Sequence, residues 1–108
     1  MKILITGGAG FIGTNLIKQL LKDGHDVHSL DNYDSGLHSN EISGCNYMEL
    51  DIRRMSFMDD DFDVVYHLAA LSRIQPSFDR PHETFRVNTE GTSRVLDWAR
   101  ENKIKVIY

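Results

Sequence analysis

The sequence predicts an α/β fold built on a doubly wound parallel β-sheet, and three observations predict it. Short apolar runs bounded by turn residues alternate with segments of helical periodicity. The first apolar run leads directly into a glycine-rich turn that opens a helix, and the second run ends at a carboxylate, Asp31. Right-handed crossovers between successive strands then give the strand order 3-2-1-4-5, with the sheet truncated after strand five.

The first half of the chain is expected to form two strands around one helix. Residues 2–6 form a short strand around the continuous apolar run Ile3-Leu4-Ile5, as in a central strand that is covered on both faces. Apolar side chains recur at helical spacing from Ile12 to Leu21, and Gly24 supplies a stop signal. A second strand is predicted over 25–30. The following loop, 31–44, is rich in Asp, Asn, Ser and Gly.

The second half is expected to complete the sheet. Residues 46–50 form a weakly marked third strand, and 62–68 form a fourth that is rich in β-branched and aromatic residues. The charged connection between them has room for one helical turn. Residues 82–102 have the periodicity of the longest helix, in which Val95, Leu96 and Trp98 are apolar, and 105–108 begin a fifth strand.

Composition excludes several classes of partner. The chain of 108 residues fits one soluble domain, with 41% hydrophobic and 26% charged residues. Its net charge of −4 argues against nucleic-acid binding, and no apolar run is long enough to span a membrane. The single Cys45 and the five histidines lack metal-ligand spacing. We therefore expect a cytoplasmic protein without a metal site, a nucleic-acid partner or a membrane anchor.

Three glycines between the first strand and the first helix predict a diphosphate-binding turn. Gly7, Gly10 and Gly13 follow a G-x-x-G-x-x-G spacing. The first permits a tight turn, the second lets a diphosphate approach the backbone, and the third allows the helix to pack closely. Amide N–H groups and the positive end of the helix dipole would then face the phosphates.

Asp31 is the acidic partner expected of such a turn. It lies 18 residues after Gly13, at the end of the second strand, where a carboxylate can accept both hydroxyl groups of an adenosine ribose. The same charge would repel a 2′-phosphate, and neither Asn32 nor Tyr33 is the arginine that NADP recognition usually uses. The sequence therefore favours NAD over NADP.

An ordered set of motifs makes the chain resemble a known family. The set comprises TGGAGFIG at 6–13, DN at 31–32, DI at 51–52, HLAA at 67–70 and VNxxGT at 87–92. In these motifs the chain resembles the extended short-chain dehydrogenase/reductases, which have a Rossmann-type fold. Within them it is most similar to the NAD-dependent nucleotide-sugar epimerases and dehydratases. The resemblance implies that 1–108 is an NAD-binding domain in part, with the C-terminal catalytic and substrate-binding part absent.

The resemblance also implies which residues contact NAD. Besides the glycine turn and Asp31, Phe11 and Ile12 would contact the diphosphate. The adenosine would be lined by Asn32, Ser35 and Gly36, and its adenine by Asp51 and Ile52. The loop after the fourth strand would pass beneath the diphosphate and nicotinamide ribose with Leu68, Ala69, Ala70 and Ser72, and Asn88 would brace this loop. Ile52 and Leu68 are also compatible with plain core positions. Asn88 is also compatible with satisfying buried backbone groups.

The family's acid/base pair, Tyr-x-x-x-Lys, is missing, because no tyrosine of this chain is followed four residues later by lysine. We therefore assign no catalytic residue and expect these 108 residues alone to be inactive. By resemblance, the complete enzyme would transiently oxidise a sugar carbon of a nucleotide sugar, expected to be a UDP-sugar, by hydride transfer to tightly bound NAD, and would be a homodimer. Two alternatives stay open: a non-catalytic dinucleotide-binding module or sensor, and a short-chain reductase of a small carbonyl substrate.

Overall fold

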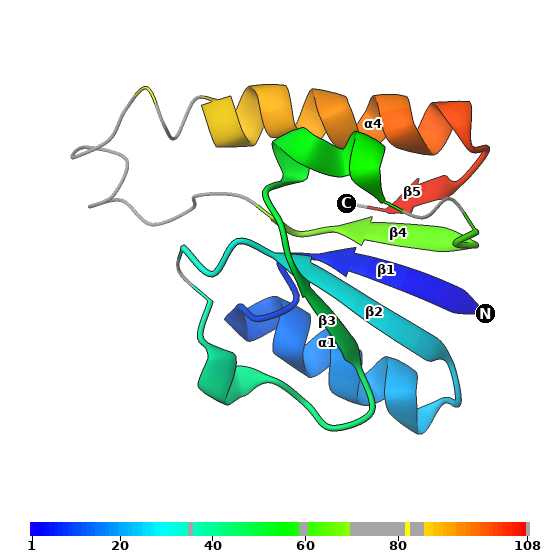
Figure 1. The fold of residues 1–108 in the computed structure, drawn as a ribbon. Helices are drawn as coiled ribbons and strands as arrows, with labels where there is room; N and C mark the ends of the chain where they lie inside the picture. The colour runs from blue at the N-terminus through cyan, green and yellow to red at the C-terminus, as the bar shows by residue number, and fades with distance from the viewer. Residues whose placement is uncertain (35, 59–60, 70–81, 83–85, 108) are drawn as a thin grey trace.

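Five parallel strands form one sheet in the order β3-β2-β1-β4-β5 in a computed structural model of the chain (Figure 1). The structure describes residues 1–34, 36–58, 61–69, 82 and 86–107. The strands are β1 (Lys2–Thr6), β2 (Asp26–Asp31), β3 (Asn46–Glu49), β4 (Val64–His67) and β5 (Lys105–Ile107). Every pairing is parallel. The predicted fold class and strand order are therefore confirmed.

Helical segments cover both faces of the sheet, which is why the consecutive residues Ile3, Leu4 and Ile5 of β1 are all apolar. Helix α1 (Phe11–Lys22) lies on one face, and η2 (Ile52–Phe57) with α4 (Thr92–Glu101) lies on the other (Figure 1). Successive β1 side chains point to opposite faces, so Ile3 and Ile5 join the α1 core while Leu4 joins the α4 core. The sheet therefore separates two hydrophobic cores. None of the helical segments that the structure describes is long and apolar enough to cross a membrane.

The long C-terminal helix departs from the prediction. Within the predicted range 82–102, His82 is helical, and the described chain from residue 86 is a π-helical segment, η3 (Arg86–Gly91), that continues as α4. A Cβ atom on Gly91 would lie 2.3 Å from Cδ1 of Ile52, so the glycine lets η2 pack closely against the junction of η3 and α4. Leu96 is 40% exposed, because Val95, Trp98 and Ala99 form the buried face of α4.

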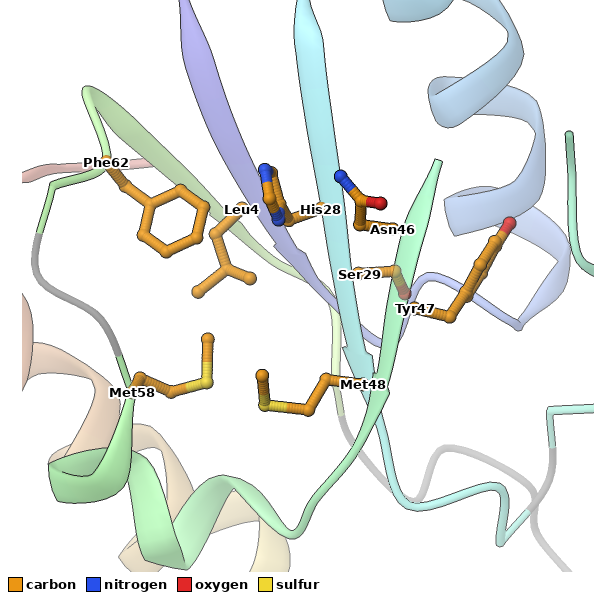
Figure 2. Close-up of a pocket in the computed structure, with 8 residues that line it drawn as sticks. All are labelled: Leu4, His28, Ser29, Asn46, Tyr47, Met48, Met58 and Phe62. Carbon is orange, nitrogen blue, oxygen red and sulfur yellow. The ribbon is translucent and has the colours of Figure 1, made fainter. Parts of the chain in front are cut away.

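A small cavity of about 60 Å³ opens beside β2 and β3 (Figure 2). Its lining combines polar and apolar side chains: Leu4, His28, Ser29, Asn46, Tyr47, Met48, Met58 and Phe62. Figure 2 shows Met48 and Met58 projecting into the same space from β3 and from the segment after η2. The cavity is large enough for about two water molecules, and no residue predicted to bind the cofactor lines it.

Candidate functional site

The carboxyl ends of β1, β2 and β4 bring the predicted site together. The strand order reverses between β1 and β4, which is where doubly wound sheets bind their ligands. The glycine turn follows β1, Asp31 ends β2, and Leu68 and Ala69 follow β4. Figure 1 shows these three connections at one edge of the sheet. The structure therefore brings these predicted residues to one edge of the sheet.

Two of the three glycines are required by the fold itself. Gly7 has a φ of 80°, and a Cβ atom there would lie 2.9 Å from the backbone nitrogen of Ala69. A Cβ atom on Gly13 would lie 2.4 Å from the carbonyl oxygen of Gly7. On Gly10 it would only make an ordinary 3.5 Å contact with that oxygen. Gly10 therefore leaves room for a ligand, whereas Gly7 and Gly13 let the turn close on β4 and α1.

The first turn of α1 presents amide donors without internal acceptors. Within the described part of the chain, the N–H groups of Phe11, Ile12 and Gly13 have no hydrogen-bond acceptor, and the first backbone bond runs from Thr14 to Gly10 at 2.9 Å. No side chain caps this end and no acidic residue lies in the first turn. The Phe11 and Ile12 side chains are 84% and 67% exposed. Such an end favours an anion.

Asp31 is built into the glycine turn. Its side chain is 8% exposed, and Oδ2 accepts a hydrogen bond from the Ala9 backbone N–H at 3.0 Å. Oδ1 accepts one from the backbone N–H of Tyr33 at 2.8 Å. Because each carboxylate oxygen can accept more than one hydrogen bond, Asp31 keeps acceptor capacity for ribose hydroxyls. The carboxylate thus orders the turn and still offers charge to a ligand.

Ala9 is a contact point that sequence reasoning missed. It is fully buried, and its carbonyl oxygen accepts hydrogen bonds from the backbone of Leu37 at 3.4 Å and from Nδ2 of Asn40 at 3.2 Å. A Cβ atom on Gly36 would lie 2.8 Å from Cβ of Ala9. The loop after β2 is therefore fastened to the glycine turn. An alanine has no side-chain chemistry that could have signalled this role.

Thr6 performs a similar role on the β4 side. Its hydroxyl oxygen accepts hydrogen bonds from the backbone N–H groups of Leu68 and Ala69, both at 3.2 Å. It also lies 2.7 Å from Nδ1 of His67, whose Nε2 lies 2.9 Å from the hydroxyl of Thr92. Burial lowers the pKa of His67. A polar residue ending an apolar strand was the one sequence signal for Thr6.

The remaining predicted residues take varied positions. Oδ1 of Asn32 accepts a hydrogen bond from the backbone of Asp34 at 3.0 Å, which shapes the turn after β2. Asp51 follows β3 and accepts hydrogen bonds from the side chain and backbone N–H of Arg53, which lower the pKa of this carboxyl. Ile52 is buried in the α4 core, and Asn88 is exposed in η3.

The cofactor-binding roles of Asn32, Asp51, Ile52 and Asn88 stay predictions. Ser35, Ala70 and Ser72 lie outside the described residues. Among the residues that are described, no group of three or more potential ligands could hold a metal ion.

The strand order, with a glycine turn after β1 and a carboxylate at the end of β2 bonded to that turn, defines a Rossmann-type fold. Comparison with known proteins gives the family. The family model described as "NAD dependent epimerase/dehydratase family" matches residues 3–108, and the chain belongs to this family. The predicted family and its NAD dependence are therefore confirmed.

Characterised relatives act on nucleotide sugars. The chain is 36% identical to a UDP-N-acetyl-alpha-D-glucosaminuronate decarboxylase of Bacillus cytotoxicus, over 99% of this chain and 35% of that protein. It is 37% identical to a UDP-glucose 4-epimerase of Mycolicibacterium smegmatis, over 93% of this chain and 35% of that protein. The chain thus spans about a third of the length of these relatives.

Solved structures give the same picture. A UDP-galactose 4-epimerase structure superposes with a TM-score of 0.89 at 34% identity, covering 98% of this chain and 37% of that one. The Thermus thermophilus UDP-glucose 4-epimerase, solved in complex with NAD, superposes with a TM-score of 0.86 at 31% identity. The superposition covers 100% of this chain and 37% of the Thermus thermophilus chain.

Proposed function

We propose that this chain binds NAD across the carboxyl ends of β1, β2 and β4, as the NAD-binding portion of an enzyme that acts on a nucleotide sugar. The observation that carries the proposal is that amide donors and a carboxylate lie at the same turn. Among the described residues the amides of Phe11, Ile12 and Gly13 have no acceptor, and the Asp31 carboxylate is bonded to the same turn. The amides suit a diphosphate, and the carboxylate suits the adjoining ribose.

Each connection takes one part of the cofactor in this proposal. The residues after β2, including Asn32 and Gly36, line the adenosine, and Asp51 with Ile52 lies at the adenine. Leu68 and Ala69 pass beneath the diphosphate and nicotinamide ribose, where Thr6 fixes their backbone. Bound NAD supplies a hydride acceptor for a sugar carbon. The negative charge of Asp31 disfavours the 2′-phosphate of NADP.

The substrate class rests on the relatives. Both characterised relatives above are named for UDP-sugars, and a Thermotoga maritima UDP-glucose 4-epimerase that superposes with a TM-score of 0.87 was solved with UDP-glucose. We therefore propose a UDP-sugar as the substrate of the complete enzyme. The 108 residues themselves contain no Tyr-x-x-x-Lys pair, so we expect them to bind NAD without interconverting UDP-glucose and UDP-galactose.

Calorimetric titration of the chain with NAD and with NADP tests the proposal. We expect one NAD molecule to bind per chain, and NADP to bind at least about tenfold more weakly because its 2′-phosphate would meet Asp31. Failure of both dinucleotides to bind, or tighter binding of NADP, would overturn the proposal.

A further inference from the structure

A series of side-chain hydrogen bonds crosses the β4 side of the site. It runs from Thr6 at the end of β1, through His67 at the end of β4, to Thr92 at the start of α4. The Thr6 side chain is fully buried and His67 is 8% exposed. Residues 61 and 25 positions apart in the sequence are thereby joined at the backbone that would pass beneath NAD.

The hydrogen-bond geometry favours one arrangement of the protons. A threonine hydroxyl can accept two hydrogen bonds and donate one. Thr6 Oγ1 accepts from the Ala69 N–H and shares the Leu68 N–H with the Thr6 carbonyl oxygen, which lies at 3.0 Å, and we assign its own proton to the bond with Nδ1 of His67 at 2.7 Å. In this arrangement Nδ1 is unprotonated, and the ring proton lies on Nε2, from which it is donated to the Thr92 hydroxyl at 2.9 Å.

We propose that His67, as a neutral ring protonated on Nε2, is a positioning residue for NAD: it orients the Thr6 hydroxyl so that Leu68 and Ala69 are held in place for the cofactor. The inference rests on the proposed function. A second ring proton on Nδ1 would compete with the Thr6 proton and make Thr6 release one of the two amides. NAD affinity then falls as His67 becomes doubly protonated.

The surroundings of His67 favour the neutral ring. Burial lowers its pKa, so the second proton binds below the ordinary value of about 6.5. The elements packed against β4 carry several charged side chains in their described parts. Each of these side chains pairs with another of them, pairs with Asp61, or faces solvent. They are Lys2 of β1, Lys105 of β5, Glu90 of η3, and Arg94, Asp97, Arg100 and Glu101 of α4.

Nitrogen-15 NMR of the histidine rings tests the proton positions in the wild-type chain. We expect the His67 signals at pH 7.5 to show an unprotonated Nδ1 and a protonated Nε2, identified by their loss in a His67→Asn variant. A ring that is protonated on Nδ1, or on both nitrogens, at this pH would overturn the inference. This measurement does not depend on NAD.

NAD titrations on two variants test the positioning role. The side-chain oxygen of His67→Asn can take the place of Nδ1 as an acceptor for Thr6 but does not titrate, whereas His67→Leu has no acceptor. At pH 7.5 we expect His67→Leu to bind NAD about two- to tenfold more weakly than wild type, the effect of one hydrogen bond, and His67→Asn to retain affinity.

The pH profile separates positioning from general support of the fold. Wild-type affinity should fall by a similar factor as the pH drops through the His67 pKa measured by NMR, and His67→Asn should lack this step. By linkage, NAD should lower the His67 pKa further. Unchanged NAD affinity in His67→Leu, or a wild-type profile flat across that pKa, would overturn the inference alone. Absence of NAD binding to wild type would instead overturn the proposed function.

Discussion

The two sides of the site differ in whether their polar groups are hydrogen-bonded within the protein. On the β2 side, the first turn of α1 leaves the amides of Phe11, Ile12 and Gly13 without acceptors in the described chain, beside the Asp31 carboxylate. On the β4 side, Thr6 and His67 use their polar atoms in bonds within the protein. The comparison teaches how the proposed function divides between them: the first side would recognise the ligand by charge, and the second would hold a backbone surface in place beneath it.

Substitution of Gly13 in the glycine turn should have the largest effect on the difference between the two sides. Gly13→Ala places a Cβ atom 2.4 Å from the Gly7 carbonyl oxygen, so the turn must shift. We expect the free energy of unfolding to fall by about 1–3 kcal/mol and NAD affinity to fall at least about tenfold. Urea denaturation and calorimetry measure the two effects.

Gly10→Ala is the matched control, because its Cβ atom meets only the Gly7 carbonyl at 3.5 Å. We expect stability close to wild type together with weaker NAD binding. If this variant binds NAD as wild type does, the diphosphate does not approach Gly10.

Removal of the charge at the end of β2 should give the next largest effect. Asp31→Ala removes the acceptor of the ribose hydroxyls and of the Ala9 amide. We expect NAD binding to weaken by about 1–3 kcal/mol, measured by calorimetry. Asp26→Ala, in the same strand but at its amino end, should leave affinity unchanged. Equal effects of the two changes would remove Asp31 from the site.

The loop after β2 offers a smaller test. Asn40→Ala deletes the side-chain hydrogen bond to the Ala9 carbonyl, and we expect a loss of about 0.5–1.5 kcal/mol in the free energy of unfolding. Asn46→Ala, an exposed position on β3, serves as the control in the same urea titration. A loss no greater in Asn40→Ala than in the control would show that the loop does not depend on this bond.

The smallest expected effect is a pH dependence at the surface of that loop. Hydrogen bonds from His38 and Tyr33 lower the pKa of Glu41. A carboxyl group whose pKa is lowered on folding stabilises the fold at pH values above its pKa in the unfolded chain. This contribution is lost as the pH falls through the folded-state pKa. Glu41→Gln should therefore be less stable than wild type near neutral pH and approach it in acid. Urea titrations at several pH values test this, and a difference independent of pH would contradict it.

Local patterns were sufficient for most of the fold. The strand predicted over residues 2–6 coincides with β1, and α1 starts at Phe11, one residue before the first apolar position of its predicted helix. Strand order followed from crossover handedness. The π-helical segment η3 was not predicted, because one extra residue in a turn barely changes the apolar periodicity of a helix.

The site was only partly predictable for a related reason. Glycine spacing and an acidic residue after β2 are local signals, so the sequence could single out Gly7, Gly13 and Asp31, which the structure joins in one turn. Ala9 and His67 act through residues distant in sequence, such as Asn40 and Thr6, and no local pattern encodes those contacts. The sequence showed only that the histidines lack metal-ligand spacing, and the hydrogen bonds of His67 to Thr6 and Thr92 became visible in the structure.

The most direct test of the central claim is a titration of the isotope-labelled chain with NAD, followed through the backbone amide signals. The account predicts that the largest shifts occur at the amides of Phe11, Ile12 and Gly13, because these donors have no acceptor within the described chain and would bond to the diphosphate. Saturable binding of NAD that leaves these three signals in place would contradict it.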